Sequence, residues 1–179
     1  KAGETYLAVA VIGGLAALTG LFLLYRQLGT LSLDAMAAAA AGAEDRGLLW
    51  VGGLLVLVGF GAKAGAFPLH IWLPTAHPAA PAPASAVLSG VITKTGIYGV
   101  LVLSTTVFLH DKQWGMLLAV LGAVTMVLGA VLAVLSVDLK RTLACSSISQ
   151  IGFILVGTAM LCLLGEHNAL AVDGTILHI

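Results

Sequence analysis

The chain has 179 residues, of which 60% are apolar and only 9% are charged, and its formal net charge is zero. A soluble domain is about half apolar and about a quarter charged, and it could not hide this much apolar surface from water. A zero net charge also provides no basic field for nucleic acid. The composition therefore predicts a membrane protein that does not bind nucleic acid.

Apolar runs separated by short polar turns follow one another along the whole chain. A helix needs about 20 apolar residues to cross a bilayer. We predict membrane spans at 5–26, 47–76, 83–109, 113–137, 142–165 and 168–179. The last run stops at the end of the sequence, so we expect the chain to be a piece of a longer polypeptide. The predicted fold is a single all-α domain over 1–179, a polytopic transmembrane helix bundle.

The second predicted span is interrupted by proline. All five prolines of the chain lie between Pro68 and Pro83. Proline removes a backbone donor and clashes with the preceding helical turn, so we predict a helix break near 63–68, at Pro68. A broken helix at membrane depth must be buried in protein or must line a wet cavity.

Lys63 and Lys94 lie within apolar runs that are long enough to span a membrane. An ammonium at membrane depth costs a few kcal/mol, and such residues commonly mark ion or proton pathways. The alternative is a lysine near a helix end whose ammonium reaches the headgroups. The placement of both lysines favours a relay that moves charge.

Several other polar side chains are candidates for the same relay. His178 lies well inside the last apolar run, while His70 and His77 flank the proline-rich segment and could either shuttle protons or bond to freed backbone groups. Ser85, Ser89 and Thr93 recur every four residues and could line a water path beside Lys94 or simply join helices.

The sequence offers the relay no obvious acidic partner. The carboxylates lie at span ends, except that Asp173 approaches an apolar interior, so we expect the partner of Lys63 to lie outside this chain. There is no phosphate-binding loop, no dinucleotide fingerprint and no cluster of metal ligands. We expect no catalytic residue, no metal and no cofactor.

Two long stretches carry a family resemblance. Residues 60–99, FGAKAGAFPLHIWLPTAHPAAPAPASAVLSGVITKTGIYG, resemble the antiporter-like membrane subunits of respiratory complex I, Mrp-type Na⁺/H⁺ antiporters and energy-converting hydrogenases. Residues 138–157, DLKRTLACSSISQIGFILVG, match the same family at the start of a later helix. The residues of the first stretch are most similar to the formate-hydrogenlyase type of hydrogenase subunit, or to the Mrp D-type subunit.

The resemblance implies a fold of inverted five-helix repeats, each with a broken helix. It implies that Lys63 is the central lysine of the first half-channel, that Lys94 is the connecting lysine on the next helix, and that His178 links the two half-channels. It also places the first span's start in the cytoplasm of a multi-pass protein of the cell (inner) membrane. The family's acidic partner for the first lysine, and its second half-channel, would lie outside this chain.

Three functions remain open from the sequence. The leading one is proton translocation by a non-catalytic subunit of a redox-driven respiratory or hydrogenase complex, with other membrane subunits as partners. The second is an Mrp-type Na⁺/H⁺ antiporter subunit without redox coupling, in which sodium is moved as well. The third is a structural bundle whose lysines only pair with buried groups.

Overall fold

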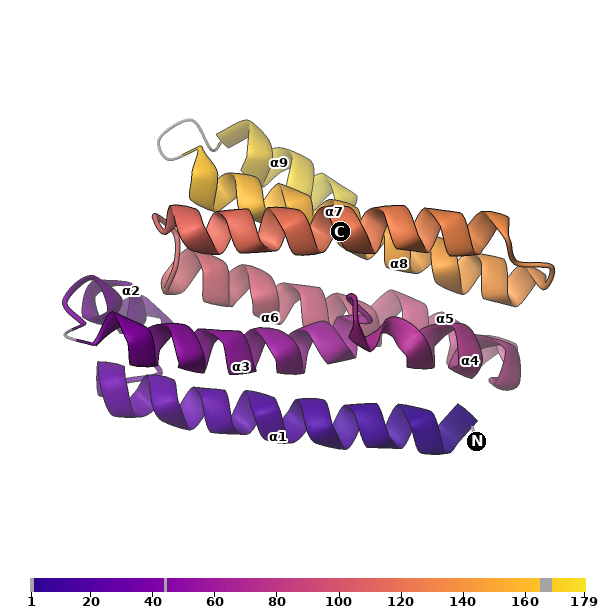
Figure 1. Ribbon diagram of the computed structural model, residues 1–179, viewed down its shortest axis with the longest axis horizontal. Coiled ribbons are helices and arrows are strands. Elements are labelled where there is room, and N and C mark those ends of the chain that lie inside the picture. Colours follow the sequence, from indigo (N-terminus) through magenta and orange to yellow (C-terminus); the bar gives the residue numbers. More distant parts are fainter. Residues whose placement is uncertain (1, 44, 165–168) are drawn as a thin grey trace.

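The computed structural model describes residues 2–43, 45–164 and 169–179, which are all helix, turn or connection. The helices are α1 (Ala2–Leu28), α2 (Leu33–Ala41), α3 (Arg46–Ala64), α4 (Trp72–Ala79), α5 (Ala82–Val87), α6 (Thr93–Thr106), α7 (Lys112–Val134), α8 (Leu139–Leu163) and α9 (Ala169–His178). A 3₁₀ turn, η1 (Leu69–Ile71), precedes α4, and a π-helix, η2 (Leu88–Ile92), joins α5 to α6. The predicted all-α bundle is confirmed (Figure 1).

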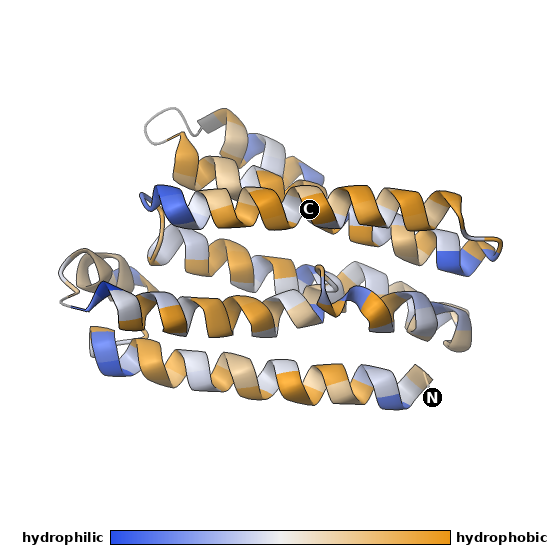
Figure 2. Ribbon diagram, in the orientation of Figure 1, coloured by the Kyte–Doolittle hydropathy of each residue, from blue (hydrophilic) through white to orange (hydrophobic). Residues whose placement is uncertain are grey.

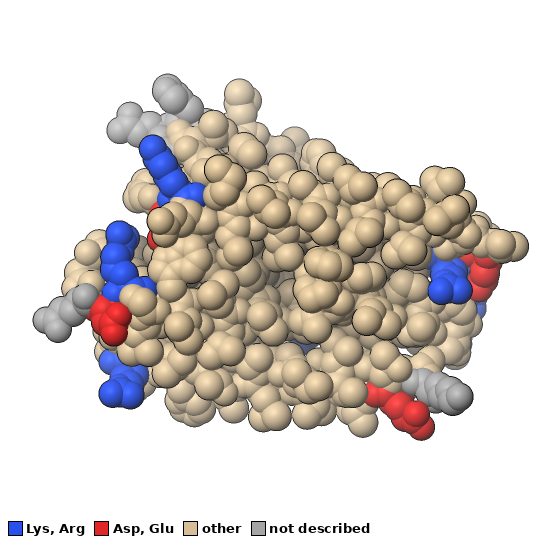
Figure 3. Space-filling model, viewed as in Figure 1, with Lys and Arg blue, Asp and Glu red and all other residues tan. Residues whose placement is uncertain are grey.

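Five helical stretches of the described chain are long and apolar enough to cross a membrane. They are Ala2–Leu28, Arg46–Ala79, Ala82–Thr106, Lys112–Val134 and Leu139–Leu163. Charged side chains gather at the two ends of the molecule in the face drawn in Figure 3, and the surface between them is almost entirely uncharged. The boundary predicted between the spans 142–165 and 168–179 lies outside the described residues.

Aspartate side chains cap the N-termini of three of the long helices. Asp45 accepts a hydrogen bond from Leu48 N at 3.0 Å at the start of α3, and Asp111 accepts from two amides at the start of α7. Asp138 accepts from Lys140 N at 3.1 Å at the start of α8. A side-chain oxygen at the N-cap satisfies amides that have no partner within the helix. The acidic residues that the sequence places at span ends therefore set where these helices start.

Two helix pairs, α1 with α3 and α7 with α8, pack closely along their lengths, and α6 lies between them (Figure 1). Small residues allow this approach, as in many membrane bundles. A Cβ added to Gly20 would lie 2.6 Å from Gly52 O, and one added to Gly122 would lie 2.8 Å from Gly152 O.

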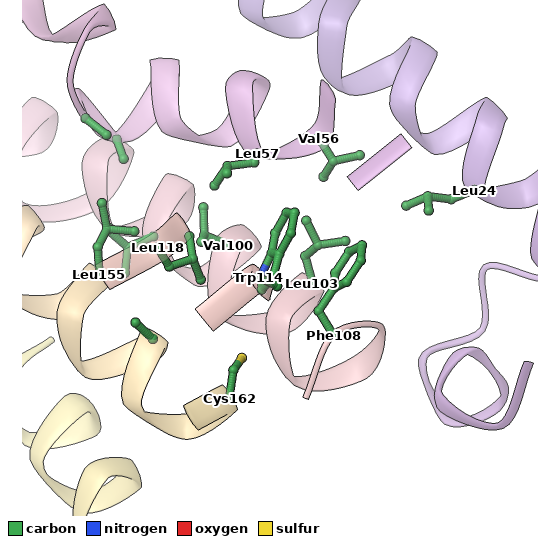
Figure 4. Packing of buried hydrophobic residues seen from close by; sticks show 14 of the residues in the cluster. Leu24, Val56, Leu57, Val100, Leu103, Phe108, Trp114, Leu118, Leu155 and Cys162 are labelled. Atoms are coloured by element: carbon green, nitrogen blue, oxygen red, sulfur yellow. The ribbon is translucent and has the colours of Figure 1, made fainter. Parts of the chain in front are cut away.

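The apolar core fills the space where these pairs meet. Figure 4 shows side chains of α3, α6, α7 and α8 converging there, including Leu57, Val100, Leu118 and Leu155. At one end, the Phe108 and Trp114 rings stack with centroids 4.0 Å apart. This core fixes the positions of the helices around the break between α3 and α4.

Candidate functional site at the broken helix

The second span leaves helical geometry between Ala64 and Leu69. Gly65 ends α3 with φ +83°, a left-handed conformation that glycine adopts without steric cost. The amides of Gly65 and Ala66 both donate to Gly61 O at 2.9 Å, which closes the helix end. Hydrophilic residues concentrate near this bend and at the helix ends (Figure 2). α3 therefore ends at Gly65, and Pro68 directly precedes the 3₁₀ turn η1.

Two side chains hold the break in place. The indole Nε1 of Trp72 donates to Ala62 O at 2.8 Å, and the amide of Phe67 donates to Thr125 Oγ1 of α7 at 3.2 Å. Trp72 is only 1% exposed, so it is a packing residue. Sequence reasoning missed Thr125, because a single threonine in an apolar helix usually bonds to its own backbone. Thr125 also does this, by donating to Leu121 O at 2.7 Å.

Replacing Trp72 by phenylalanine is expected to destabilise the break. The substitution keeps most of the ring but leaves Ala62 O, next to Lys63, without its donor. A buried carbonyl without a partner costs about 1–3 kcal/mol. The thermal midpoint of the purified protein should fall. Trp50→Phe removes a bond to Asp111, which is partly exposed so that water can replace the donor, and should lower the midpoint less. Equal midpoints for wild type and Trp72→Phe would show that this hydrogen bond does not support the break.

Lys63 occupies the last turn of α3, beside the break. Its side chain is exposed in the described chain and helps to line a cavity of about 270 Å³ between α1 and the broken helix. The other lining residues are mostly small or aromatic and include Tyr6, Gly13, Phe60, Trp72 and Ile92. A cation at a helix C-terminus is favoured by the helix dipole. The cavity is therefore lined by one lysine at a helix end and otherwise mostly by apolar residues.

Lys94 lies on the helix that touches α3 at the same level. It is half-buried in the first turn of α6. Two residues later, a Cβ added to Gly96 would lie 2.7 Å from Phe60 O and 2.5 Å from Ala64 N. The backbones of α6 and α3 are thus in contact over the turns that carry the two lysines. Within the described residues, neither ammonium forms a hydrogen bond or an ion pair.

The hydroxyls before Lys94 have different partners, and the π-helix η2 includes one of them, Ser89. Ser85 Oγ bonds to Nδ1 of His77 at 2.5 Å, whereas Ser89 Oγ lies 3.2 Å from Ser147 Oγ of α8. Thr93 Oγ1 instead donates to Ser89 O at 2.8 Å. The segment nevertheless links His77 to α8 through polar side chains.

His178 meets α8 farther along the same helix. Its Nε2–H donates to Gln150 Oε1, and its ring lies 4.3 Å from the Phe153 ring between centroids. Gln150 is three residues after Ser147, so the two side chains are neighbours on the surface of α8. Among the described contacts, His178 bonds to neither lysine. Polar side chains of α8 lie between it and the Lys94 segment.

The two histidines of the proline-rich segment differ in their surroundings. His77 is 4% exposed, and its Nε2 has no partner among the described residues. The half-buried His70 stacks on Phe67 with centroids 5.9 Å apart, and its Nδ1 likewise has no described partner. His77 thus joins the polar contacts leading to α8, whereas His70 lies at the break itself.

Comparison with known proteins decides the family. Residues 1–178 match the model of a family described as NADH:quinone oxidoreductase/Mrp antiporter, TM. The chain belongs to this family. Because its described residues include five helices able to span a membrane, this NADH:quinone oxidoreductase/Mrp antiporter family member is a multi-pass membrane protein.

Relatives in the family cover different kinds of complex. The chain is 38% identical to hydrogenase-4 component B of Escherichia coli, covering 98% of the chain and 26% of that protein. It is 34% identical to a Na(+)/H(+) antiporter subunit from Alkalihalophilus pseudofirmus, covering 97% and 34%. The chain therefore spans about a quarter to a third of the length of these relatives.

Solved structures of the family share the fold. A chain of the membrane-bound sulfane sulfur reductase, an archaeal respiratory membrane complex, matches with a TM-score of 0.83 and 31% identity, over 99% of this chain and 30% of its own length. A chain of the Mrp complex from Dietzia sp. matches with a TM-score of 0.81 and 31% identity, over 89% and 29%. The chain is thus similar in structure both to a chain of a respiratory complex and to a chain of an Mrp complex.

Proposed function

We propose that this chain is the translocating core of an antiporter-like membrane subunit that moves protons along Lys63, Lys94 and His178. The observation that carries the proposal is the contact between α3 and α6 at Gly96, which brings two intramembrane lysines to adjoining turns beside a helix break. Ionisable residues are costly at this depth, and a pair of them without a described structural partner favours a functional role.

The lysine pair has the properties that a proton relay needs. The lysines lie on adjoining turns of α3 and α6, so a proton released by one has the other close by to receive it. Lys63 faces a cavity beside α1 that can receive water or an acidic side chain from a part of the protein outside this chain. Protonation and release can then alternate between Lys63 and Lys94.

The route from Lys94 to His178 follows the polar side chains on α8. Ser89 contacts Ser147, and Gln150 on the same helix bonds to His178. Hydroxyl, amide and imidazole groups both donate and accept hydrogen bonds, so this series supports proton transfer through intervening water. His77 and Ser85 would extend this route toward the proline-rich segment. Thr93 donates to a backbone carbonyl beside Lys94 and so stabilises the helix there. His70 remains a second candidate for proton transfer at the break.

A redox-driven complex of the inner cell membrane is the proposed setting, with other membrane subunits as partners. Support comes from the hydrogenase-4 relative and from the likeness to a chain of a respiratory complex. The second candidate is an Mrp-type Na⁺/H⁺ antiporter subunit, favoured by the Na⁺/H⁺ antiporter relative and by the likeness to a chain of the Mrp complex. In either setting this chain supplies the ion path and no cofactor.

The two settings are separated by measuring ion movement in the intact complex in proteoliposomes. We expect proton uptake to follow the addition of an electron donor and to persist when sodium is omitted. Proton movement that needs a sodium gradient, at a rate that the electron donor does not change, would assign the chain to the antiporter setting. An assembled, active complex that moves neither ion through this subunit would contradict the proposed function altogether.

A further inference from the structure

A polar hollow lies where α3 and α7 begin, far along the bundle from the break. Its volume is about 390 Å³, and it is lined by Arg46, Gly47, Trp50 and residues 110–113. Figure 3 shows basic side chains gathered at this end of the molecule, with an acidic patch between them. Nothing in the proposed ion path uses this hollow.

The lining of the hollow carries two permanent cations and one carboxylate. Arg46 and Lys112 are exposed and form no ion pair within the described residues, and His110 adds a further donor. The one lining carboxylate, Asp111, is already engaged. Its Oδ1 accepts from Gln113 N at 2.9 Å and Trp114 N at 3.1 Å, and its Oδ2 accepts from Trp50 Nε1 at 3.1 Å.

The position of the hollow indicates what it meets. α3 and α7 are both membrane spans, and each begins at one of the two cations, so the hollow lies at the level of lipid headgroups. Exposed apolar side chains continue from it down both helices, namely Val51, Leu54, Met116 and Val120. Trp50, an amphipathic ring of the kind found at membrane interfaces, forms one wall.

We propose that this hollow binds one anionic phospholipid. The phosphodiester lies between Arg46 and Lys112, and the acyl chains run along the exposed apolar residues of α3 and α7. Among the lining groups, two permanent cations face one carboxylate, so a singly charged headgroup balances them and a zwitterionic one does not. Asp45, just outside the lining, has its carboxylate engaged with Leu48 N.

The test measures lipid binding to the intact complex after delipidation. Phosphatidylglycerol is added stepwise, and native mass spectrometry counts the lipids bound at each step. Phosphatidylethanolamine and inorganic phosphate are titrated in parallel. The double variant Arg46→Gln/Lys112→Gln is compared with wild type, with Arg26→Gln/Arg141→Gln as the matched loss of two cations elsewhere. Each cation near a headgroup contributes about fivefold in affinity, so the double variant should lose about 25-fold at one site.

We expect wild type and the matched control to retain one more tightly bound phosphatidylglycerol than the double variant, and the charge-keeping variant Arg46→Lys/Lys112→Arg to retain it too. Should the double variant fail to assemble, Lys112→Gln alone should show the fivefold loss. Equal retention in wild type and the glutamine variants would overturn the site. Equal binding of phosphatidylethanolamine, or displacement by inorganic phosphate, would overturn its assignment to an anionic lipid.

Discussion

Replacement of Lys63 by methionine is expected to lower the rate of cation translocation about 100-fold, within the range by which a positioned proton-transfer group accelerates a reaction. Methionine fills a similar space beside the cavity but carries no proton. The measurement is ion uptake by the assembled complex in proteoliposomes, normalised to the amount of complex. Lys94→Met should have a comparable effect, because the proposed relay passes through both lysines.

The variant Lys63→Arg separates charge from proton exchange. Arginine keeps the positive charge at the end of α3 but does not release its proton in proteins. Translocation should therefore stay low in this variant, although the helix end keeps its cation. Arg26→Gln, at an exposed position in the last turn of α1, is the control and should transport normally. Normal transport by Lys63→Met and Lys63→Arg would leave the lysine with a structural role only.

A second large effect is expected when Gly152 is replaced by alanine. The added Cβ would lie 2.6 Å from Gly122 O and would also collide with the backbone of Met126 on α7. A side chain can relieve a clash by changing its rotamer, but backbone atoms cannot, so α7 and α8 must move apart. Overpacking of this kind costs about 1–3 kcal/mol, which exceeds the gain of about 1 kcal/mol that alanine normally brings to a helix.

The matched substitution is Gly174→Ala in α9, where nothing lies within 4 Å of the added Cβ. There only the helix preference remains, so stability should stay the same or rise. Thermal unfolding and the yield of assembled complex measure both variants. An unchanged midpoint for Gly152→Ala would mean that α7 and α8 are packed less closely than the structure has them.

The sequence was sufficient to predict the helical bundle. Long apolar runs need membrane helices to pair their backbone groups, so this feature follows from local chemistry. The break was expected at Pro68, whereas the structure ends α3 at Gly65 and continues α4 through Pro78. Lys63 and Lys94 stand out because a charge within an apolar run is costly wherever the helix lies. The inverted repeats implied by the family resemblance stay a prediction.

Contacts between distant segments could not be predicted in this way. Thr125 is one hydroxyl within an apolar helix, and only the packing of α7 against the break gives it the Phe67 amide as a partner. The π-helix, which holds Ser89 and directly precedes Thr93, has no local signal in the sequence either. Which residues meet across helices depends on packing geometry that periodicity alone does not specify.

The hydrogen bond of Trp72 also makes the site visible to spectroscopy. An indole emits at a wavelength and intensity that depend on nearby charge and on its hydrogen bond, and this one bonds to the carbonyl beside Lys63. Tyr6, with its ring 5.1 Å away, can pass excitation to it. Trp50 and Trp114 form a separate pair at the other end of α3, with centroids 5.5 Å apart. The fluorescence of Trp72 can therefore report the charge at Lys63 without an added label.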